Sequence, residues 1–227
     1  MGYIKVIFIA LTLLFGNIAQ AANQLVFSSG YFFLFDKSQE IVSQIYKRLG
    51  YDIIIDIYPA KRALKMSNSG LVDGELFRIK GLQQTYSNLR MVPTPLYELE
   101  ALALSINLAV EVNNLQDLQP YKIGIISGAE YAKKETIGMD THLANNYKEL
   151  FNMLERKRVD VIVCIKPACL FELKRLKINN IKILGVVKRM FVYHYLHRKH
   201  EKLVPLVDEQ IIQMHKEGII EKIVKQD

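Results

Sequence analysis

The chain has 227 residues, half of them hydrophobic, and its 30 Lys and Arg residues exceed its 23 Asp and Glu residues to give a formal net charge of +7. This composition excludes intrinsic disorder and leaves enough apolar side chains for a sizeable core in one or two compact lobes. The basic residues are spread along the chain, so we expect no nucleic-acid partner, whereas such a surface attracts small anions or an anionic membrane face.

The N-terminal residues have the pattern of a secretory signal. Lys5 precedes an apolar run at residues 6–15, and Ala19-Gln20-Ala21 matches the A-x-A cleavage pattern. The run is shorter than the about 20 residues that a membrane-spanning helix needs. We therefore expect residues 1–21 to be a cleaved signal peptide and the protein to reach the periplasm, with an uncleaved anchor as the alternative.

The first half of the chain alternates strand and helix patterns. It predicts a strand at residues 25–27, a helix at 36–49, a strand at 51–58, a helix at 59–70 and a strand at 73–79. Asp36 or Ser38 can cap the first helix, Gly50 ends it, and Pro59 suits the first turn of the second. This succession predicts a parallel sheet with helices on both faces.

The second half begins the same scheme again. It predicts strands at 102–106, 121–126, 159–164, 181–184 and 190–196, a helical turn at 115–118, and helices at 144–157, from Pro167, and at 202–216 up to Gly218. The fold class is therefore α/β, with two lobes that are each a mostly parallel sheet flanked by helices, joined by two hinge strands. We expect lobe 1 to comprise residues 22–103 and 194–227, and lobe 2 residues 104–193.

Five short features carry a resemblance to a known family. They are residues 69–73 at a helix end and third strand, 95–97 at the entry to the crossover, 121–128 at the start of the second unit, 158–162 on a later strand, and Met214 with Gly218 at the end of the last helix. In this order they resemble the type II periplasmic solute-binding proteins of the amino-acid-binding kind, over nearly all of 22–227. The resemblance implies a binding protein that closes two lobes on a small ligand and serves an ATP-driven (ABC) importer, with a sensory role as the alternative.

The sequence departs from that family at its ligand anchors. Thr85-Tyr86 stands where amino-acid-binding members have an arginine, and Cys164-Ile165-Lys166 stands where they have an acid. Residues 31–35 replace the usual Pro-Pro-aromatic motif. Because an unpaired buried charge costs several kcal/mol, we do not expect an ordinary α-amino acid to be held in the usual way.

Three charged residues of the first lobe are predicted to share one cleft. Arg78 on the third strand suits a bidentate contact with a carboxylate or phosphate, or else pairs with Glu75. Arg62 lies at a helix start, where a cation gains nothing from the helix dipole, so a ligand or a structural pair with Glu75 or Asp73 is expected. Glu75 either accepts from a ligand cation or organises the arginines.

Three further candidates lie in loops. Tyr31 can stack on a ligand or pack between the lobes, whereas we expect Phe32, Phe33 and Phe35 to be core residues. Ser127 and Gly128 precede a helix start, where backbone N–H groups can hold an anion, or they form an ordinary turn.

The cysteines and histidines give no sign of a metal site or a catalytic site. For Cys164 and Cys169 we favour two reduced, half-buried thiols; a disulfide would need their Cα atoms within about 7 Å. We assign His194, His197 and His200 to a hinge strand and a solvated segment. Because no Ser-His-Asp or Cys-His motif is present, we expect a monomeric, non-enzymatic protein without a cofactor or metal; a secreted, dehydratase-like enzyme on the same fold is the alternative.

Overall fold

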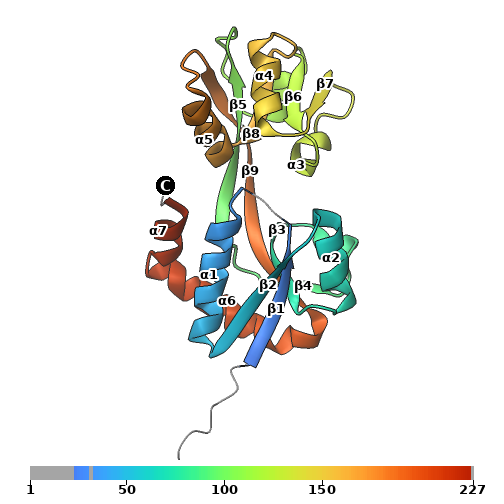
Figure 1. Cartoon of the computed structure of the whole chain (residues 1–227), viewed down its shortest axis with the longest axis vertical. Coiled ribbons are helices and arrows are strands. Elements are labelled where there is room, and N and C mark those ends of the chain that lie inside the picture. The colour runs from blue at the N-terminus through green and yellow to red at the C-terminus, as the bar shows by residue number, and fades with distance from the viewer. Residues whose placement is uncertain (1–22, 31–32, 226–227) are drawn as a thin grey trace, which may run out of the picture.

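The computed structural model describes residues 23–30 and 33–225. It shows two lobes arranged along the long axis of the molecule and joined by two long strands, β5 (Tyr97–Ser105) and β9 (Lys182–His197) (Figure 1). The predicted two-lobed α/β architecture with two connecting strands is thus confirmed. No helix in the described ranges has the length and apolar character that a membrane span requires.

Lobe 1 contains the sheet predicted from the first half of the chain. Its strands are β1 (Asn23–Ser29), β2 (Tyr51–Ile57), β3 (Gly74–Ile79) and β4 (Leu89–Met91). They are ordered β2-β1-β3-β9, with β4 paired to β9, and β1 is parallel to both β2 and β3. The predicted β-α-β-α-β unit with parallel strands is therefore correct.

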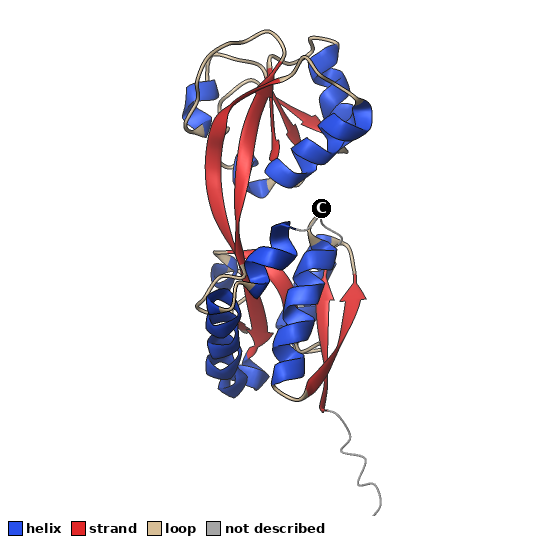
Figure 2. Ribbon diagram, turned by 90° about the vertical axis from the view of Figure 1, so that its left-hand side faces the viewer, coloured by secondary structure: helices blue, strands red, loops and turns tan. Residues whose placement is uncertain are grey.

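Helices cover both faces of this sheet. They are α1 (Phe35–Arg48), α2 (Ala60–Ser69), α6 (Val204–Lys216) and α7 (Ile219–Lys225), with short 3-10 turns η1 (Leu82–Gln84) and η3 (Arg198–Leu203). Helices α1, α6 and α7 share one core with the sheet, in which Ile41, Ile45 and Ile211 are fully buried. Leu64 of α2 packs against Tyr193 and Tyr195 on the other face. Figure 2 views the lobe from the side of α1 and α7 and shows helices in front of the strands. The apolar stripe of each helix thus faces the sheet, as the spacing predicts.

Lobe 2 has the same layers in a smaller form. Its elements are η2 (Leu115–Leu118), β6 (Ile123–Ile126), α3 (Glu130–Lys133), β7 (Thr141–Ala144), α4 (Tyr147–Glu155), β8 (Val161–Ile165) and α5 (Lys166–Leu176). The sheet order is β5-β8-β6-β7, and β6 is parallel to both β7 and β8. The predicted helix at 144–157 is too long, because β7 ends at Ala144 and Asn146 caps α4 by accepting a 2.9 Å hydrogen bond from the Glu149 N–H.

Strand β9 differs from the prediction of two strands at 181–184 and 190–196. It is one strand of 16 residues that pairs with β5 in lobe 2 and with β3 and β4 in lobe 1. The sheet is therefore continuous through both lobes. The expected lobe boundaries, after residues 103 and 193, stay a prediction; both fall inside these long strands.

The interpretation of Cys164 and Cys169 as reduced thiols is wrong. The two residues form a disulfide with their Cα atoms 5.8 Å apart. Cys164 is the penultimate residue of β8, and α5 begins at Lys166 without an intervening loop, so the first turn of the helix brings Cys169 back over the strand end. The approach of the Cα atoms to within about 7 Å follows from this strand-to-helix junction.

Candidate functional site

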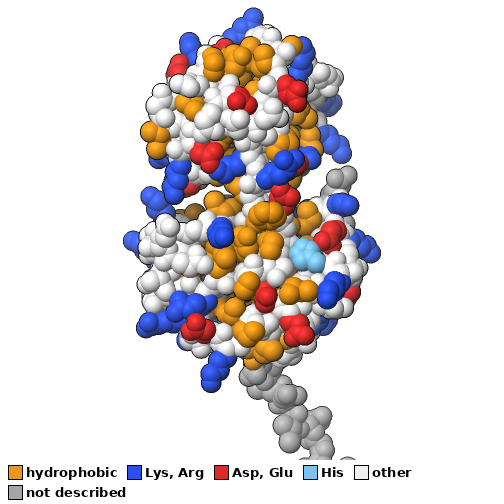
Figure 3. All heavy atoms as spheres, turned by 180° about the vertical axis from the view of Figure 1, so that it is seen from behind, with side chains coloured by type: hydrophobic (Ala, Val, Ile, Leu, Met, Phe, Trp, Pro, Cys, Tyr) orange, Lys and Arg blue, Asp and Glu red, His pale blue; other side chains and the backbone are white. Residues whose placement is uncertain are grey.

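The parallel strands of the two lobes point toward each other. Strand β5 leads from lobe 1 to lobe 2, and β8 and β9 are antiparallel to it, so both return toward lobe 1. Strand β3 is antiparallel to β9, and β1 and β2 follow β3, whereas β6 and β7 follow β8. The carboxyl ends of both sets therefore meet where the surface is hollowed between the lobes (Figure 3), here called the interlobe groove. In open α/β sheets, ligands bind outside the carboxyl ends of the strands.

Three aromatic rings connect the lobes at this groove. Phe33, between β1 and α1, has its ring centroid 5.7 Å from that of Phe171 on α5 and 6.5 Å from that of Tyr147 at the start of α4. Both pairs have the edge-to-face geometry that aromatic quadrupoles favour. Phe33 is 44% exposed and Phe171 52%. The expectation that Phe33 is a core residue is thus wrong, because it precedes α1, while Phe35 inside the helix is buried as predicted.

Arg78 and Glu75 form an ion pair inside lobe 1. The Nη2 atom of Arg78 lies 2.6 Å from Oε1 of Glu75 and donates a 3.2 Å hydrogen bond to the Ala60 carbonyl. Residues three apart on a regular strand face opposite sides, but the pairing of β3 with β9 is irregular between these two positions. This irregularity places both side chains on the same face. The Glu75 side chain is fully buried, and that of Arg78 is 11% exposed.

Two serine hydroxyls complete the surroundings of Glu75. Ser28 Oγ lies 2.8 Å and Ser67 Oγ 3.2 Å from its Oε2 atom, and the two hydroxyls contact each other. Burial raises the pKa of Glu75 to about 7, although Arg78 and the hydroxyls oppose this shift. Burial likewise lowers the pKa of Arg78, with Glu75 opposing. Glu75 therefore organises Arg78 from within the lobe, which is one of the two roles that the sequence left open.

Arg62 lies apart from this pair, on the exposed side of the first turn of α2. Its guanidinium carbon is 5.3 Å from the ring centroid of Tyr58, a cation–π distance. The predicted alternative of a pair with Glu75 or Asp73 is not among the ion pairs of the described residues; Asp73 pairs with Lys199 and His200 instead. Arg62 and Arg78 nevertheless flank the same helix turn, because Arg78 contacts Ala60.

On the lobe 2 side, Ser127 and Gly128 directly follow β6 and are exposed. The Ser127 N–H donates a 2.7 Å hydrogen bond to the Ala144 carbonyl, so its hydroxyl is the group that can meet a ligand. Gly128 turns the chain with a φ of +90°, a conformation that favours glycine. The candidate Tyr31 and the expected core residue Phe32 lie outside the described residues.

The three histidines of the C-terminal segment do not gather. His194 is buried in lobe 1, with Nε2 3.0 Å from the Tyr46 hydroxyl and Nδ1 2.9 Å from the Leu76 carbonyl. Burial lowers its pKa to about 4. Within the described ranges, no group of His, Cys, Asp and Glu side chains is arranged to hold a metal ion.

Comparisons with known proteins agree with this geometry. No protein-family model matches the chain. A protein of Shewanella oneidensis MR-1, described as uncharacterized, is 27% identical over 203 residues, which are 86% of this chain and 76% of that protein. Three similar solved structures are the GluR0 ligand-binding core with L-glutamate (TM-score 0.73, 11% identity, 90% of this chain and 98% of that one), a histidine kinase sensor domain similar to periplasmic binding proteins (0.70, 14%, 89% and 95%) and the substrate-binding protein of an amino acid ABC transporter (0.61, 18%, 89% and 97%).

The chain has the type II periplasmic solute-binding fold. In this solute-binding fold the groove between the lobes joins residues that lie far apart in the sequence. Of the predicted candidates, Arg62 and Arg78 lie at its lobe 1 side, and Ser127 and Gly128 follow a strand end on its lobe 2 side.

Sequence reasoning did not name Lys166 as a site residue, although it noted this lysine as a departure. Lys166 begins α5 at the carboxyl end of β8, and its side chain is 49% exposed. Its Nζ lies 2.6 Å from a Glu100 carboxylate oxygen, and Arg189 of β9 holds the other oxygen at 3.0 Å. The hydrogen bond from Lys166 is the largest of the effects that lower the pKa of Glu100. A cation thus occupies the lobe 2 side of the groove.

Proposed function

We propose that this protein is a non-catalytic, exported solute-binding protein that closes its lobes on a small anionic ligand and delivers it to an ATP-driven importer in the inner membrane. The observation that carries the proposal is the placement of Arg62 on one side of the groove and Lys166 on the other, at opposed strand ends. Closure would bring two cations onto one bound anion, and hinge closure around a ligand is a common motion of such lobes.

The acidic groups beside the groove are already engaged. Glu75 is buried between Arg78 and two serine hydroxyls, and Glu100 is held by Lys166 and Arg189. A ligand ammonium would have to compete with these pairs. An anion has to share Lys166 with Glu100, but Arg62 forms no ion pair among the described residues, and its guanidinium can bind a carboxylate through two parallel hydrogen bonds. The exposed rings of Phe33 and Phe171 offer apolar contact to the rest of such a ligand.

A sensory role is the second candidate, because a histidine kinase sensor domain shares this fold over 89% of the chain. A sensor would bind the same ligand with the same closure of the lobes, but a different partner protein would recognise the closed state. An enzyme is less well supported. Glu75, with its pKa near neutrality, is the group that acid–base chemistry would need, yet its side chain has no exposed surface with which to contact a substrate.

A thermal-shift screen against organic acids, amino acids, peptides and polyamines tests the ligand class. A ligand present at 100 times its Kd stabilises the folded protein by about 2.7 kcal/mol. We expect mono- or dicarboxylates to raise the melting temperature and polyamines to leave it unchanged. Stabilisation by polyamines alone would refute the anionic site.

Two substitutions then locate the binding site. Lys166→Gln and Arg62→Gln are expected to weaken the shift caused by the best anion, whereas Lys174→Gln, which removes an exposed charge near the other end of α5, should leave it intact. Equal shifts in all three variants would place the ligand elsewhere. Arg78 is unsuited to this test, because its removal would leave Glu75 buried without its cation. Uptake of the identified ligand in a strain lacking the protein separates import from sensing.

A further inference from the structure

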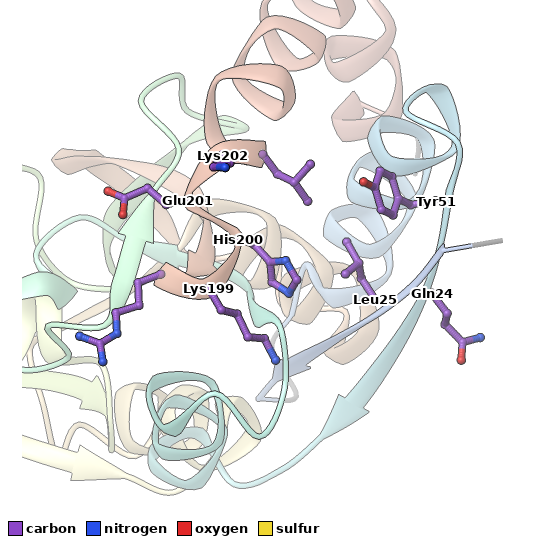
Figure 4. A pocket seen from close by; sticks show the side chains of 9 residues that line it. Gln24, Leu25, Tyr51, Lys199, His200, Glu201 and Lys202 are labelled. Atoms are coloured by element: carbon purple, nitrogen blue, oxygen red, sulfur yellow. The ribbon is translucent and has the colours of Figure 1, made fainter. Parts of the chain in front are cut away.

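A second hollow lies on lobe 1 at the amino ends of β1 and β2, which is the end opposite to the interlobe groove. It encloses about 640 Å³, and the segment η3 forms one wall of it (Figure 4). Its lining residues are Gln24, Leu25, Tyr51, Arg198, Lys199, His200, Glu201, Lys202 and Leu203. Figure 4 shows His200 projecting from η3 toward Leu25, with Tyr51 on the far side. A volume of this size lies in the range of small-molecule sites.

The charges around this hollow are strongly unbalanced. Lys199 and His200 share Asp73, at 2.9 and 2.6 Å from its Oδ1 atom. Within the part of the chain that the structure describes, no acidic side chain forms an ion pair with Arg198 or Lys202. These two side chains therefore give the hollow an uncompensated positive charge.

The one acidic side chain of the lining does not oppose this charge. Glu201 pairs with Arg90, whose Nε lies 3.1 Å from its carboxylate. It projects to the side of η3 away from Leu25 and Tyr51 (Figure 4). The hollow thus combines a guanidinium and an ammonium group with a phenol hydroxyl, all of which can donate hydrogen bonds.

We propose that this hollow is a binding site for a phosphate-bearing anion. Arg198 supplies the planar fork that matches phosphate oxygens, and Lys202 adds a point charge. Tyr51 adds its hydroxyl from the opposite wall. The site is separate from the groove proposed for the solute, because the two lie at opposite ends of the strands of lobe 1.

Two sources present such an anion, namely free phosphate and the headgroups of an anionic lipid surface. The charge of the hollow gives the lipid source its physical basis. Arg198 and Lys202 lie on one short segment, η3, and the chain as a whole carries a net positive charge. Cationic side chains clustered at a protein surface attract anionic membrane faces.

Binding of two probes distinguishes these sources. The purified protein is titrated calorimetrically with inorganic phosphate, and separately sedimented with vesicles of phosphatidylglycerol mixed with phosphatidylcholine or of phosphatidylcholine alone. We expect the double variant Arg198→Ser/Lys202→Ser to bind phosphate more weakly and to lose about 30-fold in partitioning onto the anionic vesicles, since each cation near such a surface contributes about a factor of five. Binding of phosphate without vesicle binding assigns the site to the free anion; binding of both assigns it to the headgroup.

A matched control removes the same charge elsewhere. Lys65→Ser/Lys174→Ser takes two exposed lysines from α2 and α5 and should retain both activities. Equal losses in the two double variants would overturn the proposal, because general charge would then explain the binding. Glu201→Gln serves as a second variant that leaves the cations in place; because Glu201 points away from the hollow and pairs with Arg90, this variant is expected to retain binding to both probes, and loss of binding would contradict the site. Absence of binding to either probe by the unmodified protein would also refute the site.

Discussion

The buried imidazole of His194 makes a sharp prediction about stability in acid. The ring lies in lobe 1 between the Tyr46 hydroxyl, the Leu76 carbonyl and the ring of Phe27, whose centroid is 4.9 Å away. No carboxylate contacts it among the described residues, and the effect of burial outweighs the backbone hydrogen bonds that favour its charged form. Replacement by glutamine keeps a side chain that can donate and accept hydrogen bonds but removes the titration.

The size of the effect follows from the pKa. Burial lowers the pKa of His194 from its ordinary 6.5 to about 4. Below pH 6.5 the His194 imidazole binds a proton in the unfolded chain but stays neutral in the folded protein. The free energy of unfolding therefore decreases as the pH falls, and the decrease is complete below pH 4. At about 1.4 kcal/mol per pKa unit, the total is about 3 kcal/mol. Glu75 acts in the opposite direction, because its raised pKa destabilises the fold as the pH rises from 4.5 to about 7.

Because Glu75 also affects stability in this pH range, the wild type and the His194 variant are compared with each other at each pH. Urea unfolding of the wild type and of His194→Gln is measured from pH 7.5 to pH 4. At pH 7 the variant should be less stable by about 1 to 2 kcal/mol, because its hydrogen bonds and ring contacts are poorer. On acidification this deficit should shrink by about 3 kcal/mol, so that the variant becomes the more stable protein near pH 4.

Tyr46→Phe is the matched control. It removes the hydroxyl that contacts the His194 ring but leaves the ring and its burial, so it should cost about 1 kcal/mol at every pH and keep the wild-type acid loss. A constant difference between wild type and His194→Gln across the pH range would refute the reasoning. So would an NMR titration in which the imidazole of the folded protein protonates above pH 6.

Three further outcomes follow from contacts described above. Replacing Cys164 and Cys169 with serine should lower the stability to urea by about 2 kcal/mol and abolish the effect of reductant, as expected for a short closed loop; a reductant effect that persists would contradict the bridge. Phe33→Ala removes two ring contacts between the lobes, each worth about 1 kcal/mol, and should increase the radius of gyration in solution scattering without a large change in unfolding. An alanine Cβ at Gly185 would lie 1.9 Å from the Val112 carbonyl, so Gly185→Ala should cost more than about 2 kcal/mol in thermal unfolding; a neutral effect would be inconsistent with this packing.

Local patterns were sufficient to predict most of lobe 1 from the sequence. The β-branched run at 51–57 and the left-handed Gly70 that follows α2 are signals that neighbouring residues supply on their own. Strand β9 was predicted in two pieces because Gly185, Lys188 and Arg189 interrupt its apolar pattern. The pairing that keeps these residues extended comes from β5, more than 80 positions earlier, and no local signal reports it.

The candidate site was likewise predictable only where neighbouring residues determine the structure. The sequence placed Arg78 and Glu75 near each other but could not choose between a ligand contact and an internal pair. That choice depends on the irregular pairing of β3 with β9, which turns both side chains to one face. The role of Lys166 depends on Glu100, a partner on another strand. For Cys164 and Cys169, the outcome depended on whether a loop or a helix turn follows β8.

The continuity of β9 has a mechanical consequence. Because this single strand donates backbone hydrogen bonds to the sheets of both lobes, a break within it would strip lobe 1 of an inner strand and leave β5 with an unpaired edge. The two halves should therefore melt as one cooperative unit rather than in two steps. A polypeptide cut between the lobes would yield two fragments with unpaired backbone hydrogen-bonding groups, and each fragment would need the other to pair them. We therefore expect that neither lobe folds on its own.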